Sequence, residues 1–177
     1  MSALRLLNET IVSDSSTSSL KSLTDLFTTD FDVYQVTVSN ISLVDGTQTR
    51  LHLRLLNSSG SKVYESLYDS AVYEQWSNTT YDEEKLTSQN YWRGMAYADK
   101  HPECANGVFY FINPATPDTY SWVMGETSVS QIGTYQSNTG IGVLKKVAPM
   151  TGFCIYEGST RPIKNANIRT YGLRVDS

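Results

Sequence analysis

Apolar residues recur along most of this chain with a period of two, rather than the 3.6 of an amphipathic helix. The pattern is clearest in the segment 48–56, where three leucines alternate with His52 and Arg54. Such alternation predicts a strand with one buried and one solvated face. A similar alternation in 31–43 changes parity near Tyr34, which indicates either a bulge there or a strand buried on both faces.

Turn-forming residues divide the chain into short segments. An Asp-Gly pair at 45–46 separates the first two patterned segments, so we expect residues 31–57 to form a β-hairpin. An Asn-Pro pair at 113–114 separates 108–112 from 119–127, which predicts a second hairpin. Further strands are expected at 88–98, 147–156 and 166–174, and 62–73 fits either a strand or an irregular excursion.

The number of short segments determines the fold class that we expect. Helical spacing of apolar residues occurs only in 19–27, which predicts at most one short helix. About eight short antiparallel strands predict an all-β fold: a single antiparallel β-sandwich domain over residues 1–177, with jelly-roll or Greek-key connections. Residues 1–12 would then form either the first strand or an arm exchanged with a neighbouring subunit.

The charge balance excludes some partners. Lys and Arg number 14 against 18 Asp and Glu, a net charge of -4, so we expect no affinity based on nucleic-acid phosphates. No stretch approaches the roughly 20 apolar residues of a membrane span, so no membrane partner is expected. The N-terminus lacks the apolar core of a secretory signal, which predicts that the protein is made and folds in a cytoplasm.

The remaining composition is typical of an extracellular or virion surface. Ser and Thr supply 41 residues and Tyr supplies 12, whereas charged residues make up 18%, below the roughly 25% of an average domain. Tyrosine is favoured at interfaces because it combines contact area with a polar tip. A sandwich with exposed edge strands often covers them by association, so we expect a homo-oligomer.

Candidate catalytic groups are sparse. The two histidines, His52 and His101, are isolated, and no G-x-S-x-G turn or zinc-ligand spacing of His and Cys occurs. Cys104 and Cys154 lie far apart in the sequence and are expected to be free thiols. We therefore expect no enzymatic activity, no catalytic residues, no cofactor and no metal.

Two further motifs have stronger structural than functional interpretations. The acidic run 82–84, with Glu65, Asp69 and Glu74 before it, could supply oxygen ligands to Ca²⁺, but it lacks the D-x-D-x-D-G pattern. A solvated acidic loop is the favoured interpretation. The Gly-Ile-Gly at 140–142 resembles the start of a phosphate-binding loop, but the third glycine and the Lys-Ser/Thr ending are missing.

One aromatic group is the main candidate for a binding surface. Its members are Trp76, Tyr81, Tyr91, Trp92 and Tyr97. Such rings can fill a core or a subunit interface, or they can stack on sugar rings. The first alternative predicts buried rings, and the second predicts a shallow exposed groove with two or three coplanar rings.

The C-terminal stretch 147–173 resembles small structural proteins of tailed phages, especially phages of marine bacteria and cyanobacteria. In those proteins an apolar strand is followed by a Ser/Gly turn and a closing strand, whose ending is matched here by Ile168, Tyr171, Gly172 and Leu173. Three further segments, 32–41, 51–60 and 108–114, are similar to other strands of that family.

The resemblance implies a non-enzymatic virion protein with a jelly-roll-like sandwich, and it carries no catalytic residues. Such proteins are capsid decoration (cement) proteins or components of tails and fibres, so other virion proteins, the major capsid protein or tail proteins, are the expected partners. We favour decoration, because the chain has no coiled-coil or β-helical shaft on which a fibre would trimerise. The alternative is a tail or fibre adhesin that binds host surface glycans through the aromatic group.

Overall fold

The structure is a computed structural model that describes residues 3–13, 20–46, 49–78, 80–100, 102–131, 134–158 and 161–174. These residues form strands, turns and loops, and no helix occurs among them. The strands are β1 (Ala3–Val12), β2 (Leu20–Leu23), β3 (Val33–Leu43), β4 (Thr49–Asn57), β5 (Tyr68–Trp76), β6 (Tyr81–Gln89), β7 (Trp92–Lys100), β8 (Ala105–Ile112), β9 (Ser121–Gln131), β10 (Thr134–Leu144), β11 (Met150–Glu157) and β12 (Ile163–Arg174). The all-β prediction is confirmed.

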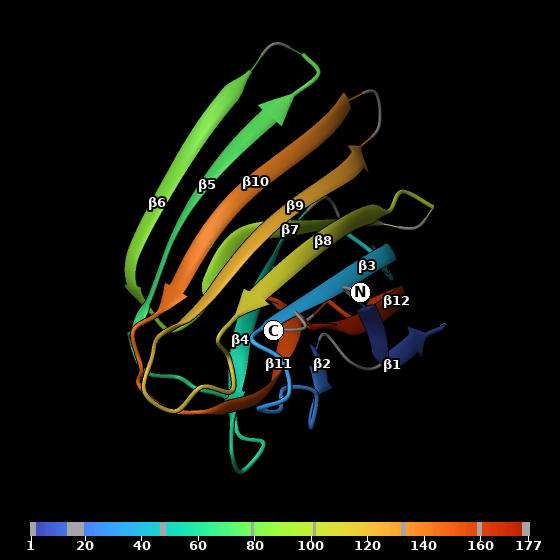
Figure 1. The fold of residues 1–177 in the computed structure, drawn as a ribbon. Helices are drawn as coiled ribbons and strands as arrows, with labels where there is room; N and C mark the ends of the chain where they lie inside the picture. The colour runs from blue at the N-terminus through green and yellow to red at the C-terminus, as the bar shows by residue number, and fades with distance from the viewer. Residues whose placement is uncertain are drawn as a thin grey trace.

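The strands form two layers that pack face to face. The large sheet has the order β1-β12-β3-β8-β9-β10-β5-β6, and the small sheet has the order β2-β11-β4-β7. A two-residue parallel pairing of β3 with β7, at Ser42/Asp99 and Leu43/Lys100, links the sheets at one corner. In Figure 1, β7 passes behind β8 and β9 of the large sheet. The predicted β-sandwich is therefore present.

Four antiparallel pairs of strands nest within one another along the chain. They are β1 with β12, β2 with β11, β3 with β8 and β4 with β7. This nesting is the strand order of a jelly roll, one of the two connection types expected. Two inserted hairpins, β5-β6 and β9-β10, add four strands to the large sheet. These four strands, which continue the large sheet beyond the small one, are called the extension below.

The hydrophobic core lies between the two sheets and is rich in aromatic rings. Phe111 of β8 stacks on Phe153 of β11 with ring centroids 5.0 Å apart, and Trp92 of β7 also packs against Phe111. The alternating leucines Leu51, Leu53 and Leu55 of β4 are fully buried, as the sequence pattern predicted. Burial of each such side chain stabilises the fold by roughly 1.5–3 kcal/mol.

The predicted hairpin over 31–57 is wrong, although both strands exist. β3 pairs with β12 and β8, whereas β4 pairs with β11 and β7, so the two strands belong to different sheets. Gly46, with φ of +90°, turns the chain from one sheet to the other. The Asp-Gly signal fixes a reversal of the chain but not which strands form hydrogen bonds.

The predicted helix over 19–27 is also wrong. Leu20–Leu23 form an edge strand on β11, and the amides of Leu26 and Phe27 then donate to the carbonyl of Thr151. The Tyr34 hydroxyl holds the next residue after Phe27, Thr28. It donates to the Thr28 carbonyl at 2.6 Å and accepts from the Thr28 amide at 2.7 Å. Backbone groups of this segment therefore bond to distant residues rather than within a helical turn.

Other local predictions are confirmed, or the structure places the feature at a different residue. The hairpin of 108–112 with 119–127 is confirmed by β8 and β9, and the last two strands correspond to β11 and β12. The parity change in β3 lies at the bulge around Asn40, whose φ is +55°, and not near Tyr34. The segment 62–73 is irregular until β5 begins at Tyr68. Residues 3–12 form a first strand, paired with β12 of the same chain.

Candidate functional site: an outer sheet face and a polar pocket

The five aromatic residues singled out in the sequence do not form one cluster. Trp92 is fully buried against Tyr68 and Phe111 in the core. Tyr97 is also buried, Trp76 and Tyr91 are half-buried, and Tyr81 is 65% exposed. The structure describes all five, and no two of them are in ring contact with each other. They therefore do not provide the shallow groove of coplanar rings that sugar stacking would need.

Tyr97 belongs to a buried polar network between β7 and the extension of the large sheet. Its hydroxyl donates to Glu74 Oε1 at 2.6 Å and accepts from Arg50 Nε. Arg50 also pairs with Glu74 at 3.0 Å and with Glu84 at 2.9 Å. Burial, followed by the hydrogen bond to Glu74, raises the pKa of Tyr97 to about 12. The phenol therefore stays protonated and acts as a donor.

Arg50 holds its charge in the same network. Burial alone would lower the pKa of Arg50, but the hydrogen bond to Tyr97 and the carboxylates of Glu74 and Glu84 outweigh it and raise the pKa. Glu84 belongs to the acidic run 82–84, which lies on the edge strand β6. The predicted acidic loop is therefore wrong in its structure, and one of its three carboxylates bonds to an arginine rather than only to water.

Polar side chains continue along the inward face of β10. Gln136 donates to Glu74 Oε2 at 3.2 Å and to Asn138 Oδ1 at 2.8 Å, and Asn138 donates to Thr127 Oγ1 at 3.2 Å. All of these side chains are buried. Buried polar groups stabilise a fold only when they are hydrogen-bonded, so this network fixes the extension against β7.

A polar pocket of about 550 Å³ lies beside this network. Its lining residues are Thr49, Arg50, His52, Tyr91, Arg93, Tyr97, Glu157 and Gly158. The His52 ring stacks on Tyr91 with ring centroids 4.1 Å apart. Gly158 lies so close to the imidazole that a Cβ atom at residue 158 would be only 2.5 Å from His52 Cε1. Thr49 donates to the buried carboxylate of Glu157 at 2.9 Å. One face of the imidazole is thus covered by the ring of Tyr91.

The chemistry available in this pocket is limited. Burial, together with the charges of Arg93 and Arg54, lowers the pKa of His52 to about 4, so the imidazole is neutral at pH 7. Cys154 of β11 lies opposite Arg54 in the strand register and does not line the pocket, and burial raises the pKa of its thiol to about 11. The pocket therefore presents a neutral imidazole and charged side chains, and the Cys154 thiol is not an activated nucleophile.

Other sequence expectations concern thiols, histidine and metal ligands. Both cysteines are free, with Cys154 buried and Cys104 half-buried, as predicted. His101 lies outside the described residues. Within the described part of the chain, no three His, Cys, Asp or Glu side chains gather as a metal site would require. No helix long and apolar enough to cross a membrane occurs in that part either.

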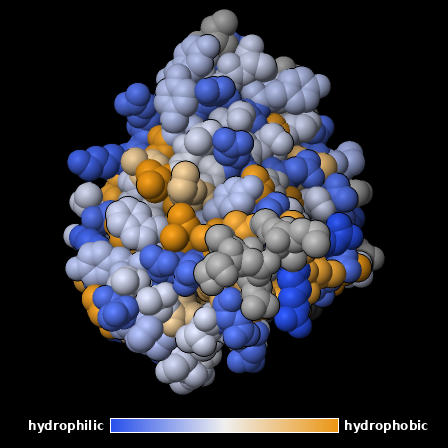
Figure 2. All heavy atoms as spheres, in the orientation of Figure 1, coloured by the Kyte–Doolittle hydropathy of each residue, from blue (hydrophilic) through white to orange (hydrophobic). Residues whose placement is uncertain are grey.

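The most distinctive surface is the outer face of the large sheet, defined as the side that faces away from the small sheet. Fourteen large apolar side chains are exposed among the residues that the structure describes, and ten of them lie on this face. They are Leu4, Leu6, Ile11, Tyr73, Tyr81, Tyr110, Trp122, Met124, Tyr135 and Ile141. Figure 2 shows apolar side chains gathered across the middle of this face.

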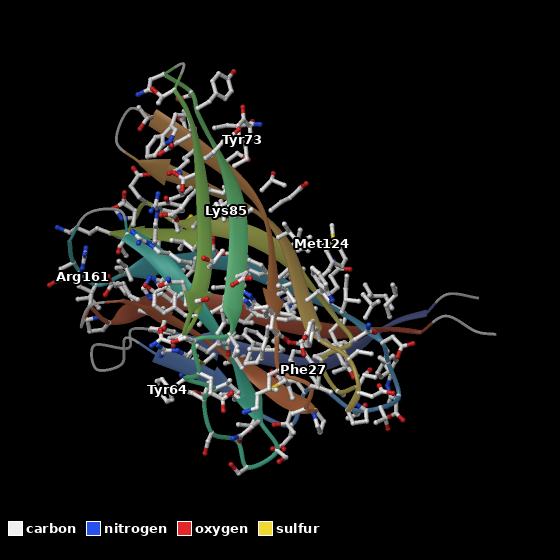
Figure 3. All side chains as sticks on the ribbon, turned by 90° about the vertical axis from the view of Figure 1, so that its left-hand side faces the viewer. Phe27, Tyr64, Tyr73, Lys85, Met124 and Arg161 are labelled. Carbon is white, nitrogen blue, oxygen red and sulfur yellow. The ribbon has the colours of Figure 1, made fainter. Side chains whose placement is uncertain are left out.

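The strand register brings these side chains together. Ile141 of β10 is paired with Met124 of β9, which is paired with Tyr110 of β8. Met124 and Ile141 are 47% and 45% exposed. In Figure 3, Met124 and Tyr73 lie on the same side of the ribbon, whereas Arg161 lies on the opposite side. Neighbouring exposed side chains on adjacent strands form a continuous patch.

The outer face is also poor in charge at its centre. On the outward-facing positions of β3, β8, β9 and β10, Glu126 is the single charged residue among those described. Toward the sides, Glu9 of β1 pairs with Arg169 at 2.8 Å and Asp69 of β5 pairs with Lys145 at 2.9 Å. Aromatic and Met residues with few charges are typical of the centre of a protein interface.

Sequence reasoning missed this face because it did not predict β10. The row formed by Tyr110, Met124 and Ile141 becomes visible only when three strands are aligned in register. A signal was present in 121–131, where Trp122 and Met124 alternate with small or buried residues. That pattern could have identified an exposed apolar face if the inward side had been assigned to Val123 and Val129.

Comparisons with known proteins identify no family for this chain. No family model matches the sequence, and no curated protein matches it. A structural similarity is found to a fructofuranosidase from Schwanniomyces occidentalis complexed with fructosylnystose, at 9% identity and a TM-score of 0.22. The match covers 96% of this chain but 34% of that chain, so this chain spans about a third of its length. A likeness this low supports no argument about fold or function.

Proposed function

We propose that this protein is a non-enzymatic structural protein of a phage virion, and that it acts as a capsid decoration (cement) protein. The observation that carries the structural role is the charge-poor apolar outer face of the large sheet. The assignment to a phage comes from the sequence resemblance of 147–173, and decoration is favoured because a single β-sandwich suits a particle surface.

The outer face supports this proposal because exposed apolar surface is costly unless a partner covers it. Single exposed apolar residues are ordinary on soluble proteins, but a patch with a charge-depleted centre is typical of an interaction site. The face is also built on strands, whose backbone is held by inter-strand hydrogen bonds. A rigid backbone loses little entropy on binding, which suits a repeated structural contact within an assembly.

Mass photometry of the purified protein, mixed with undecorated heads or with tails of the phage whose genome encodes it, tests this function. We expect binding to heads at high copy number. A Val147→Glu variant, altered at an exposed residue outside the outer face, should bind equally well. Failure of the wild-type protein to bind heads would contradict decoration, and binding to tails alone would move the protein to the tail.

A second candidate function, glycan binding, is favoured by one observation at the far end of the extension. Tyr81 of β6 stacks on Tyr73 of β5 with ring centroids 6.0 Å apart and planes 16° apart. Both rings are exposed on the outer face, and the carboxylate-bearing Glu83 lies opposite Tyr73 in the register. Exposed rings beside an acidic side chain can hold a sugar, since the rings cover its apolar face and the carboxylate accepts from its hydroxyls.

A glycan array compares the wild-type protein with a Tyr81→Ala variant to test this candidate. Glycan binding that Tyr81→Ala removes, and that Tyr64→Ala retains, would establish an adhesin role. Tyr64 is a matched control because it is exposed and lies at the opposite end of the ribbon from Tyr73, the stacking partner of Tyr81, in Figure 3. Absence of binding on the array would contradict this second function. Trp92 is unsuitable as a test residue because it is buried in the core.

A further inference from the structure

We infer that the outer face of the large sheet is covered by the same face of a second copy of this chain. The inference rests on the proposed structural role and names the first partner of that surface.

The charge distribution permits two copies to meet. The chain has a net charge of -4, which would disfavour self-association if the charges lay on the contact surface. They do not lie at its centre, where Glu126 alone is charged among the described outward-facing residues. Nearer the edges, Arg169 neutralises Glu9 and Lys145 neutralises Asp69 within one chain. Two such faces therefore meet with little like-charge repulsion.

The lack of charge also argues against a partner chosen by electrostatic complementarity. A surface that recognises a basic or acidic partner presents several charges of the opposite sign. The row Ile141, Met124 and Tyr110 instead offers apolar area and one phenol hydroxyl. Apolar surfaces with few charges are characteristic of homodimer interfaces, which are more apolar than interfaces between proteins that associate transiently.

The area of the face is sufficient for a stable pair. Eight strands spaced about 4.8 Å apart, with outward residues spread over about eight positions at about 3.3 Å each, give a face on the order of 1,000 Å². A stable interface buries about 800 Å² on each partner. A second copy that covers most of the outer face therefore reaches the size that stable association needs.

The relief of the face provides hollows for side chains of a partner. A hollow of about 210 Å³ lies beside Trp122, Ile141 and Val143. A second hollow of about 260 Å³ lies between Tyr110, Met124 and Thr139 and is also lined by Glu126. Both hollows adjoin exposed side chains, so the same face offers protruding groups and space that could receive them. Self-complementarity of this kind is what an isologous interface requires.

Sedimentation velocity of the purified full-length chain, over a range of concentrations, tests the inference with two variants. Met124→Glu and Ile141→Glu each place a carboxylate on the row that two copies would share. Both residues are nearly half-exposed, so the substitutions leave the folded chain intact. Val147→Glu adds the same charge at an exposed residue outside the outer face and serves as the matched control.

We expect the wild-type protein and Val147→Glu to sediment as assemblies of two or more chains. The assemblies formed by Met124→Glu and Ile141→Glu should dissociate into single chains at concentrations at least tenfold higher than the wild-type assembly does. Their far-ultraviolet circular dichroism spectra should be unchanged. A wild-type monomer throughout the range would overturn the inference, and so would assemblies that neither variant weakens. A monomer that still binds phage heads would overturn this inference and leave the proposed function standing.

Discussion

The indole of Trp92 in β7 packs directly against the backbone of Gly142 in β10, so that a Cβ atom on Gly142 would lie 2.6 Å from the indole Cδ1. The indole Nε1 also donates to the carbonyl of Val143 at 3.2 Å. This contact fixes the distance between the small sheet and the extension of the large one. The Gly-Ile-Gly sequence therefore has a packing role here, and its isoleucine points to the opposite, outer face.

A methyl group at Gly142 should destabilise the fold. Gly142→Ala forces the indole or the β10 backbone to move, and overpacking of this kind costs about 1–3 kcal/mol. Urea denaturation followed by tryptophan fluorescence measures the change in the free energy of unfolding. Thr139→Ala, at an exposed position of the same strand, should change it by no more than about 0.5 kcal/mol. Equal stability of the two variants would contradict the close contact.

The buried network gives a second prediction about stability. Glu74→Ala removes the shared partner of Arg50 and Tyr97 and leaves both donors without that acceptor. Breaking a buried charge pair on one side costs on the order of 3 kcal/mol. Glu83→Ala, on the exposed side of the neighbouring strand β6, is the control and should have little effect. Chemical denaturation of both variants checks the difference, and a neutral Glu74→Ala would rule out a structural role for the network.

The large-sheet extension shows where prediction from the sequence reached its limit. The strands β4, β8, β11 and β12 were foreseeable because apolar side chains alternate along them. β10 was not foreseeable, because its inward positions carry Gln136 and Asn138, whose burial depends on hydrogen bonds from other strands. β6 was read as a loop for a related reason, since an edge strand tolerates charged residues on both faces.

Pairing was harder to predict than the strands themselves. The Asp-Gly turn at 45–46 predicted a hairpin, but the partners of β3 and β4 lie far away in the sequence. Local pattern sets where the chain turns, whereas hydrogen bonding depends on long-range packing. The candidate site was predicted poorly for the same reason. Trp92 and Tyr97 proved to be buried, and the exposed row of Met124 and Ile141 is visible only once strand register is known.

Acidification should destabilise the protein through His52. The pKa of His52 in the folded state is about 4, below the value near 6.5 of an unfolded chain. As the pH falls below about 6.5, the unfolded chain binds a proton that the folded chain does not, so stability is lost until the pH reaches about 4. Between pH 7 and pH 5 the loss due to His52 should be on the order of 1–2 kcal/mol.

The variant His52→Phe isolates this contribution. Phenylalanine retains a ring that can stack on Tyr91 but cannot titrate. Denaturation at pH 7 and pH 5 should show a smaller loss of stability in His52→Phe than in the wild-type protein. An identical loss in both proteins would mean that His52 titrates normally in the folded state.

The two thiols should differ strongly in reactivity. Cys154 is fully buried and its thiol pKa is raised to about 11, so at pH 8 its thiolate is rare. Cys104 is half-buried at the surface. A maleimide dye should label Cys104 first and Cys154 on the order of 100-fold more slowly, as mass spectrometry of peptides would show. Rapid labelling of both thiols in the folded protein would contradict the burial of β11.

Deletion of residues 1–12 should abolish oligomerisation and binding to the particle. The deletion removes β1 and its pairing with β12, and with it three exposed apolar residues of the outer face, Leu4, Leu6 and Ile11. Mass photometry of the truncated protein measures assembly, and circular dichroism verifies that the remaining strands are folded. Unchanged assembly of a folded truncated protein would refute a role for β1 in the contact.

Hydroxyl-radical footprinting measures whether a partner covers the outer face of the large sheet. Oxidation of Met124 and Trp122 is compared between dilute protein, concentrated protein and particle-bound protein, with exposed Tyr64 as the internal reference. We expect several-fold slower oxidation of Met124 and Trp122 in the assembled states and an unchanged rate at Tyr64. Equal oxidation of Met124 and Trp122 in all three states would contradict this expectation.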